Sequence, residues 1–199
     1  MSYILAGGFV MYLLIIASIL AIAIIINRLR IFRKAKTQEE YLVESIRNYI
    51  DAGDIDSAIK FCGDLDNPVS RIIKAGLVEF KRGGNVEEAL KLQELVELPY
   101  LEKYIPVLGV IASISTLLGF TGTVTGMIKA FNSIAQAGVS SPQIVASGIA
   151  QALITTAAGL LIAIPTYVFY QYFEHRISIF ETELERITRQ LLLDLRRKG

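Results

Sequence analysis

The sequence has one cysteine and one histidine among its 199 residues. With Cys62 alone, the chain cannot form an internal disulfide, and a zinc site is not expected. With His175 as the single histidine, it cannot form a Ser/His/Asp triad or a histidine-rich metal cluster unless another chain completes one. We therefore predict no catalytic residue, no metal site and no cofactor, and we do not expect an enzyme.

Charge is missing from a long part of the chain. All 19 acidic residues lie within residues 39–102 or 174–194, and Lys129 is the only charged residue between Tyr104 and Phe173. A charged side chain at the bilayer centre costs about 3 kcal/mol on insertion scales, so this absence is typical of membrane burial. The net charge of +1, without a basic patch and interleaved aromatics, gives no indication of nucleic-acid binding.

Three apolar runs are present, and 53% of all residues are hydrophobic, with a mean hydropathy of +0.49. The run over residues 9–26 has no charge and nearly crosses a hydrocarbon core of about 30 Å. It is followed by five cations, which places that side in the cytosol; they are Arg28, Arg30, Arg33, Lys34 and Lys36. No basic region precedes it, so we do not expect a cleaved signal peptide. The runs 104–128 and 144–173 flank a Gly/Ser/Pro-rich segment and predict a helical hairpin.

We thus predict an all-α, multi-pass membrane protein, with lipid as one partner, a helical cytoplasmic domain and long helices that extend into the cytosol. The predicted parts are a first transmembrane helix at 1–27 with its N-terminus outside, the cytoplasmic domain at 28–103, a second transmembrane helix at 104–130, a short periplasmic turn at 131–143, a third transmembrane helix at 144–173 and a cytoplasmic C-terminal amphipathic helix at 174–199.

Helix-capping residues divide the cytoplasmic domain into four predicted helices. The signals, in chain order, are a capping box at Thr37 and Glu40, a C-cap at Gly53, an N-cap at Asp54, a start at Asn67–Pro68, a stop at Gly83–Gly84, and an N-cap at Asn85 for a helix running toward Pro99.

The C-terminal helix carries an apolar stripe with coiled-coil spacing, formed by Ile177, Phe180, Leu184, Ile187 and Leu191. Neighbouring copies in a ring can bury such a stripe. The alternative is an amphipathic helix that packs on its own soluble domain.

Small residues line one face of each helix in the predicted hairpin. In the second span, one helix face is formed by Thr116, Gly119, Thr123 and Gly126, and Gly122 lies in the same segment. In the third span, the corresponding stripe is formed by Gly148, Ala152, Thr156, Gly159 and Ala163. Such faces suit close helix packing or the lining of a narrow polar path. The pattern alone favours packing, because threonine hydroxyls often bond back to a carbonyl of their own helix.

Two segments carry a family resemblance. Residues 111–127, IASISTLLGFTGTVTGM, and 148–165, GIAQALITTAAGLLIAIP, resemble the two signature helices of the MotA/TolQ/ExbB proton-channel family, and residues 7–35 resemble its first span. The short chain is closer to the ExbB/TolQ branch. The resemblance implies a homopentameric ring around single-span ExbD/TolR-type subunits. It also implies pore-facing roles for Thr123 and Thr156, and a helix bend at Pro165.

Three positions depart from the family pattern. Gln151 stands where a glutamate is common, Asn27 where a glutamate precedes the arginine, and Thr116 where a proline is common. The three spans also contain no Asp, Glu or His. We therefore expect the partner subunit to supply a membrane aspartate, because hydroxyls and amides do not titrate near neutral pH.

The predicted function is the channel-type subunit of a motor that couples proton or sodium flow to work on a periplasmic partner, as in energised outer-membrane transport or envelope integrity. The predicted ion path contains Thr116, Thr123, Gln151 and Thr156, and the predicted packing residues are Gly119, Gly122, Gly126, Gly148, Gly159 and Pro165. The alternative is a non-conducting membrane scaffold or signalling subunit.

Overall fold

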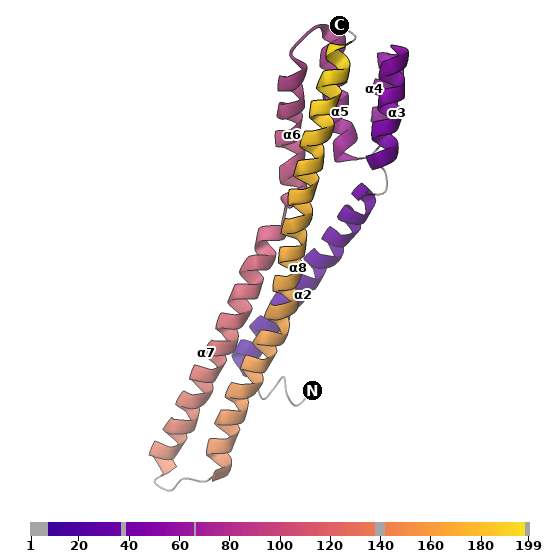
Figure 1. Ribbon diagram of the computed structural model, residues 1–199. Coiled ribbons are helices and arrows are strands. Elements are labelled where there is room, and N and C mark those ends of the chain that lie inside the picture. The colour runs from indigo at the N-terminus through magenta and orange to yellow at the C-terminus, as the bar shows by residue number, and fades with distance from the viewer. Residues whose placement is uncertain (1–7, 37–38, 66, 138–141, 198–199) are drawn as a thin grey trace. The chain divides into compact units, whose positions relative to one another are not determined.

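The computed structural model describes residues 8–36, 39–65, 67–137 and 142–197, and within these residues it is helical without strands (Figure 1). The helices are α2 (Phe9–Lys36), α3 (Glu39–Ala52), α4 (Ile55–Asp64), α5 (Pro68–Arg82), α6 (Val86–Glu102), α7 (Ile105–Ala137) and α8 (Pro142–Arg196). Three helical stretches are long and apolar enough to cross a membrane, at Phe9–Arg33, Val86–Ala135 and Val145–Arg196. The predicted all-α membrane fold is confirmed.

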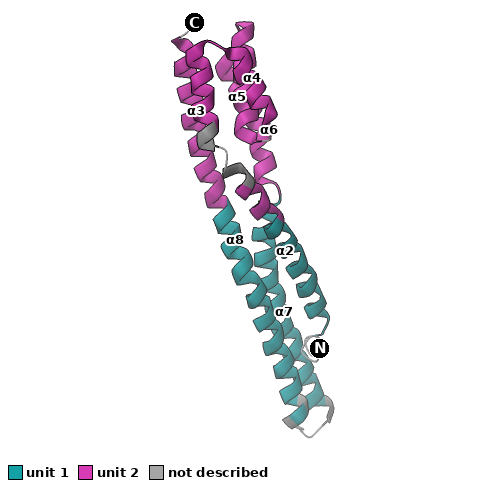
Figure 2. Ribbon diagram, turned by 90° about the vertical axis from the view of Figure 1, so that its right-hand side faces the viewer, with its two compact units in different colours: residues 1–26, 104–173 teal, residues 27–103, 174–199 magenta. Residues whose placement is uncertain are grey.

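The chain divides into two compact units (Figure 2). Residues 1–26 and 104–173 form what we call the apolar unit, whose only charged residue is Lys129. Residues 27–103 and 174–199 form what we call the charged unit. Within the hairpin, α7 continues past residue 130 to Ala137 and α8 begins at Pro142, so both helices extend into the segment predicted as a turn. The membrane boundaries themselves stay a prediction.

The short helices of the charged unit begin and end at the predicted capping residues. Asp54 accepts a hydrogen bond from the Ser57 amide at 3.0 Å, and Asn67 accepts one from the Val69 amide at 2.9 Å. Gly53 and Gly83 have φ angles of +77° and +76°, the left-handed region that favours glycine after a helix. Thr37 lies outside the described residues.

The fourth predicted helix, α6, is also capped as expected, because Asn85 accepts a hydrogen bond from the Glu88 amide at 3.2 Å. It continues through Pro99 to Glu102 rather than ending at the proline. The helix then ends before α7 begins. Between the two helices, Tyr104 has a φ of 69°, which is uncommon for an aromatic residue.

The core of the charged unit combines α3, α4, α5, α6 and the C-terminal part of α8. Leu42, Ile72 and Leu77 are fully buried in it. The stripe of α8 lies in the same core, since Phe180, Leu184, Ile187 and Leu191 all belong to it, and Ile177 is buried as well. The interpretation that neighbouring copies bury this stripe is therefore wrong. The alternative is correct, because α8 packs on its own domain.

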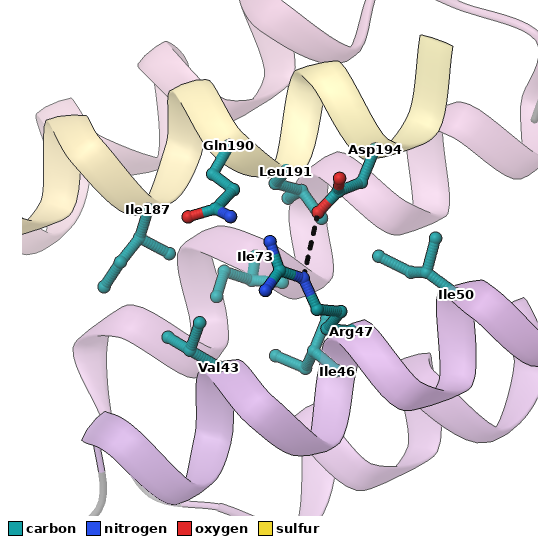
Figure 3. A pocket seen from close by; sticks show the side chains of 9 residues that line it. All are labelled: Val43, Ile46, Arg47, Ile50, Ile73, Ile187, Gln190, Leu191 and Asp194. Carbon is teal, nitrogen blue, oxygen red and sulfur yellow. Dashed lines mark ion pairs between the residues drawn. The ribbon is translucent and has the colours of Figure 1, made fainter. Parts of the chain in front are cut away.

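Figure 3 shows this packing at close range. Ile187 and Leu191 of α8 face Val43, Ile46 and Ile50 of α3 across a small apolar pocket. At its edge, Arg47 and Asp194 form an ion pair at 3.8 Å. The inner face of α8 is thus occupied within the chain.

Polar contacts fix α6 to the rest of the charged unit. Glu97 is buried and accepts two hydrogen bonds of 2.7 Å from the Arg71 guanidinium. Arg28, at the end of the first apolar run, is also buried and donates to the carbonyl oxygens of Tyr100 and Leu101 at 3.1 and 3.2 Å. A cation at these carbonyls is favourable because the last carbonyls of a helix lack partners within the helix and carry partial negative charge.

Candidate functional site

The candidate site lies in the apolar unit, where α7 and α8 pack side by side (Figure 1). The contact, which we call the seam, joins small residues of the two helices. On α7 these are Gly119, Gly122 and Gly126, and on α8 they are Gly148, Ala152, Thr155 and Gly159. All seven are buried. The predicted glycines thus come together in space.

The backbones touch at the centre of the seam. A Cβ added at Gly159 would lie 2.6 Å from the carbonyl oxygen of Ser115 and 2.9 Å from the Cα of Gly119. Because these neighbours are backbone atoms, they cannot move aside as a flexible side chain does. Glycine is required here so that the two helices can approach closely.

The two ends of the seam are equally close. A Cβ at Gly126 would lie 2.8 Å from the carbonyl oxygen of Gly148, and one at Gly148 would lie 2.8 Å from the Ala130 Cβ. At Gly122, the added atom would overlap the side chain of Thr155. Because even one added methyl group has no room at these positions, they leave no open channel between α7 and α8 of one chain.

The predicted path residues lie beside the seam or at its edge. Thr156 is half-buried, and its hydroxyl donates to the carbonyl oxygen of Gly119 across the hairpin at 3.0 Å and to that of Ala152 at 3.2 Å. Thr123 is half-buried and donates to Phe120 of its own helix at 2.5 Å. Thr116 is exposed and donates to Ala112 at 3.2 Å.

Gln151 lies at one end of the seam, next to the single charge of the apolar unit. The Lys129 ammonium donates a long hydrogen bond of 3.4 Å to its Oε1 atom. Gly8, with a φ of +67°, lies next to both side chains, because a Cβ there would be 2.5 Å from the Gln151 Nε2 atom and 4.0 Å from the Lys129 Nζ atom. Gln151 therefore joins the start of α2 to the hairpin, and its amide stands beside a cation that an amide cannot neutralise.

Two buried hydroxyl residues at the contact of α7 and α8 were not among the predicted site residues. Thr155 is fully buried, and its hydroxyl donates to the carbonyls of Gln151 and Ala152. Ser115 is also fully buried, and its hydroxyl has no hydrogen-bond partner among the described residues. Spacing could have found both, because Ser115 precedes Gly119 by four residues and Thr155 precedes Gly159 by four.

Pro165 lies away from this contact. It is exposed on α8, and the helix continues through it. The neighbouring Thr166 is buried and donates to the carbonyl of Ile162 at 2.7 Å. The predicted role of Pro165 in helix packing or bending stays a prediction.

The chemistry available at this site is that of hydroxyls, an amide and one ammonium. Over the described residues, no group of three or more His, Cys, Asp or Glu side chains could hold a metal ion. Hydroxyls can solvate an ion or hold a partner's polar group, but they do not carry a proton on and off near neutral pH. The described hairpin therefore offers hydroxyls that can solvate an ion, but no carboxylate or imidazole that binds and releases a proton.

Comparison with known proteins identifies one family and several relatives. The family described as the MotA/TolQ/ExbB proton channel family matches residues 64–186. The Tol-Pal system protein TolQ of Haemophilus influenzae is 31% identical over 186 residues, covering 87% of this chain and 82% of that protein. The biopolymer transport protein ExbB of Salmonella typhimurium is 41% identical over 86 residues, covering 43% of this chain and 35% of that protein.

A putative ExbB homolog from Methanothermobacter thermautotrophicus matches more of the chain at lower identity. It is 28% identical over 185 residues, which is 92% of this chain and 64% of that protein. The chain thus spans a little under two thirds of the length of this relative.

Proposed function

The chain belongs to the MotA/TolQ/ExbB proton channel family, in its ExbB/TolQ branch, and from this premise we propose that it is the channel-type subunit of an ion-driven motor in the bacterial inner membrane. In this role it couples the flow of protons or sodium ions to mechanical work on a periplasmic partner. Its membrane segments are those of a multi-pass protein.

The observation that carries the proposal is the closed seam with hydroxyls at its edge. Gly119 and Gly159 bring the α7 and α8 backbones into contact, while the Thr156 and Thr123 side chains remain half-buried rather than enclosed. An ion therefore has to travel along the outside of the hairpin. That surface forms a path only when another helix covers it.

The covering helix has to bring an acid. The apolar unit contains no Asp, Glu or His, and a proton needs a group that binds and releases it. We assign this role to an aspartate in the single membrane helix of an ExbD/TolR-type subunit, which stands inside a ring of five copies of this chain. One charge crossing 100 mV releases about 2.3 kcal/mol, enough to shift a two-state element by a few kcal/mol.

Gln151 distinguishes this chain within the proposal. The family pattern commonly has a glutamate at this place, and here an amide accepts a hydrogen bond from Lys129 instead. Because an amide does not titrate, Gln151 solvates ions or positions Lys129 and takes no part in proton relay.

Reconstitution tests the proposal. Vesicles containing the chain together with its single-span partner should show cation flux under an imposed voltage or pH jump, and vesicles with either protein alone should not. An absence of flux that depends on the partner would rule out the conducting role.

One observation favours a second candidate, the non-conducting scaffold. The Thr116, Thr121 and Thr125 hydroxyls all donate to carbonyls of their own helix, as they would if they only satisfied hydrogen bonds within a packed bundle. A complex that assembles with the partner and recruits cytoplasmic proteins, yet carries no cation current, would support this alternative.

A further inference from the structure

The outer face of α6 is apolar although it lies in the charged unit. Leu92, Leu95, Val96 and Tyr100 are exposed by 60, 70, 65 and 53%, at spacings that place them along one side of the helix. The opposite side of α6 is already occupied, because Leu90 is buried against α5. A contiguous row of exposed apolar side chains marks an interaction surface.

The outer face of α8 differs in character. Its inner face contacts α3 through Ile187 and Leu191 (Figure 3), and helical spacing gathers other residues on the far side, all of them exposed. These are Ile179, Arg186, Arg189, Leu193 and Arg197. Leu193 is exposed by 63%. Arg189 pairs with Glu185 of the same helix at 2.6 Å, and Arg186 and Arg197 make the rest of the face basic around Leu193.

The two faces lie at matching levels of the charged unit. Helices α6 and α8 run in opposite directions there (Figure 1). The start of α6 and the end of α8 lie at the same end of the charged unit (Figure 1). The pKa of Glu87 in the first turn of α6, lowered first by its hydrogen bond to Lys91, is also lowered by the charge of Arg196 in the last turn of α8. About one and a half turns further along, Leu92 is level with the turn of α8 that ends at Leu193.

The charges of the two faces are complementary. Glu88 and Glu102 flank the apolar row of α6, next to Lys91 and Lys103, and all four are exposed. The row on α8 carries arginines. Two α8 faces would bring guanidiniums together, whereas the α6 face offers them carboxylates beside an apolar row, so the α8 face favours α6 over itself.

We propose that the outer face of α6 in one copy docks on the outer face of α8 in the next copy, as a head-to-tail contact repeated around a ring. The proposal rests on the proposed function, since copies that share one membrane orientation keep α6 and α8 at the same level. A contact between two different faces generates a closed ring when the rotation closes.

Cysteine cross-linking of the membrane complex tests the contact. Cys62 is buried, which raises the pKa of its thiol to about 11, and Cys62→Ala removes the remaining background. Two differently tagged chains, one with Leu92→Cys and one with Leu193→Cys, are produced together with the partner subunit. Oxidation should give a linked dimer carrying both tags.

The matched control pairs Leu92→Cys with Lys60→Cys, an exposed position on α4. It should give little linked dimer. Equal linking of the two pairs, or linking of Leu92→Cys only to itself, would overturn the proposal.

Charge substitution identifies the occupant. Opposite the arginines of α8, Leu95→Arg should reduce the ring fraction about tenfold more than Leu95→Glu, which corresponds to 1.4 kcal/mol. The reverse order would indicate an anionic membrane surface or an acidic protein on α6 and would overturn the proposal. Both variants change an exposed side chain, so folding should be retained, and helical content checks this.

Native mass measurement and the flux assay separate this inference from the proposed function. A ring with partner-dependent flux but without the Leu92–Leu193 link means that only the docking surface is wrong. A chain that forms the link but carries no flux with its partner keeps the docking surface and loses the conducting role.

Discussion

The hydroxyl of Thr156 in α8 donates a hydrogen bond to the carbonyl oxygen of Gly119 in α7 at 3.0 Å. Gly119 is also where the backbones are in contact, since a Cβ there would lie 3.3 Å from the Cα of Gly159. One side chain thus belongs both to the packed seam and to the predicted ion path. Substitutions that keep its shape can separate the two roles.

Thr156→Val keeps the side-chain shape and removes the hydroxyl. Hydrogen bonds between membrane helices contribute about 0.6 kcal/mol on average, so the complex should still assemble. Partner-dependent cation flux in vesicles should fall strongly, whereas Thr156→Ser should retain most of it. Unchanged flux in Thr156→Val would remove Thr156 from the path.

Gly159→Val should disrupt the hairpin. The new side chain would meet the carbonyl oxygen of Ser115, which lies 2.6 Å from an added Cβ, and overpacking of this kind costs about 1–3 kcal/mol. The free energy of unfolding in detergent measures the effect. Ala157→Val is the matched control, because Ala157 is exposed on the same helix. Equal losses in the two variants would contradict the seam.

Gln151→Glu should convert the contact with Lys129 into an ion pair. The hydrogen bond is 3.4 Å long and its acceptor is neutral, and an exposed pair contributes about 0.2–1 kcal/mol. A double-mutant cycle with Lys129→Gln measures this coupling through the stability of the hairpin. If Gln151→Glu has the same effect with and without Lys129, the two side chains do not interact.

Cys62 should resist thiol reagents in the folded protein. Burial raises the pKa of its thiol from 9.0 to about 11. Between these two pH values the thiol stays protonated in the folded protein, whereas it is deprotonated in the unfolded protein. This contribution to stability is complete below pH 9 and is lost as the pH rises toward 11.

Two measurements check this behaviour. Maleimide labelling of Cys62 at neutral pH should follow unfolding, and the stability difference between the wild type and Cys62→Ala should decrease from pH 9 to 11. Rapid labelling of the native protein would show that the thiol is accessible.

Glu97→Gln should destabilise the charged unit. Glu97 is 6% exposed, and both of its oxygens accept hydrogen bonds from Arg71 at 2.7 Å. Hydrogen bonds to charged groups contribute about 1.5–3 kcal/mol, which urea unfolding can measure. The control is Glu87→Gln, which removes the exposed partner of Lys91 and should have little effect.

Much of the fold follows from local sequence signals. Asp54, Asn67 and Asn85 cap helices because their side chains bond the amides two or three residues ahead, and this depends on no distant contact. The apolar runs predict the three long helices for a similar reason. Pro99 was a weaker signal, since α6 continues past it to Glu102.

Helical spacing alone could not predict which surface buries an apolar stripe. The stripe from Ile177 to Leu191 fits a neighbouring copy and the chain's own core equally well, and contacts with α3 and α5 decide for the core. In the seam, the predicted face included Thr116, whereas the structure buries Ser115 and leaves Thr116 exposed. Helical spacing defines a stripe to within about one residue, and the contact with the second helix selects which neighbour is buried.

The most direct test of the central claim is cation flux into vesicles that contain this chain with its single-span partner under an imposed membrane voltage. We predict a current that requires both proteins, falls in Thr156→Val and disappears when the partner's membrane aspartate is replaced by asparagine. A complex that assembles fully and carries no current, or a current that the chain carries alone, would contradict the account.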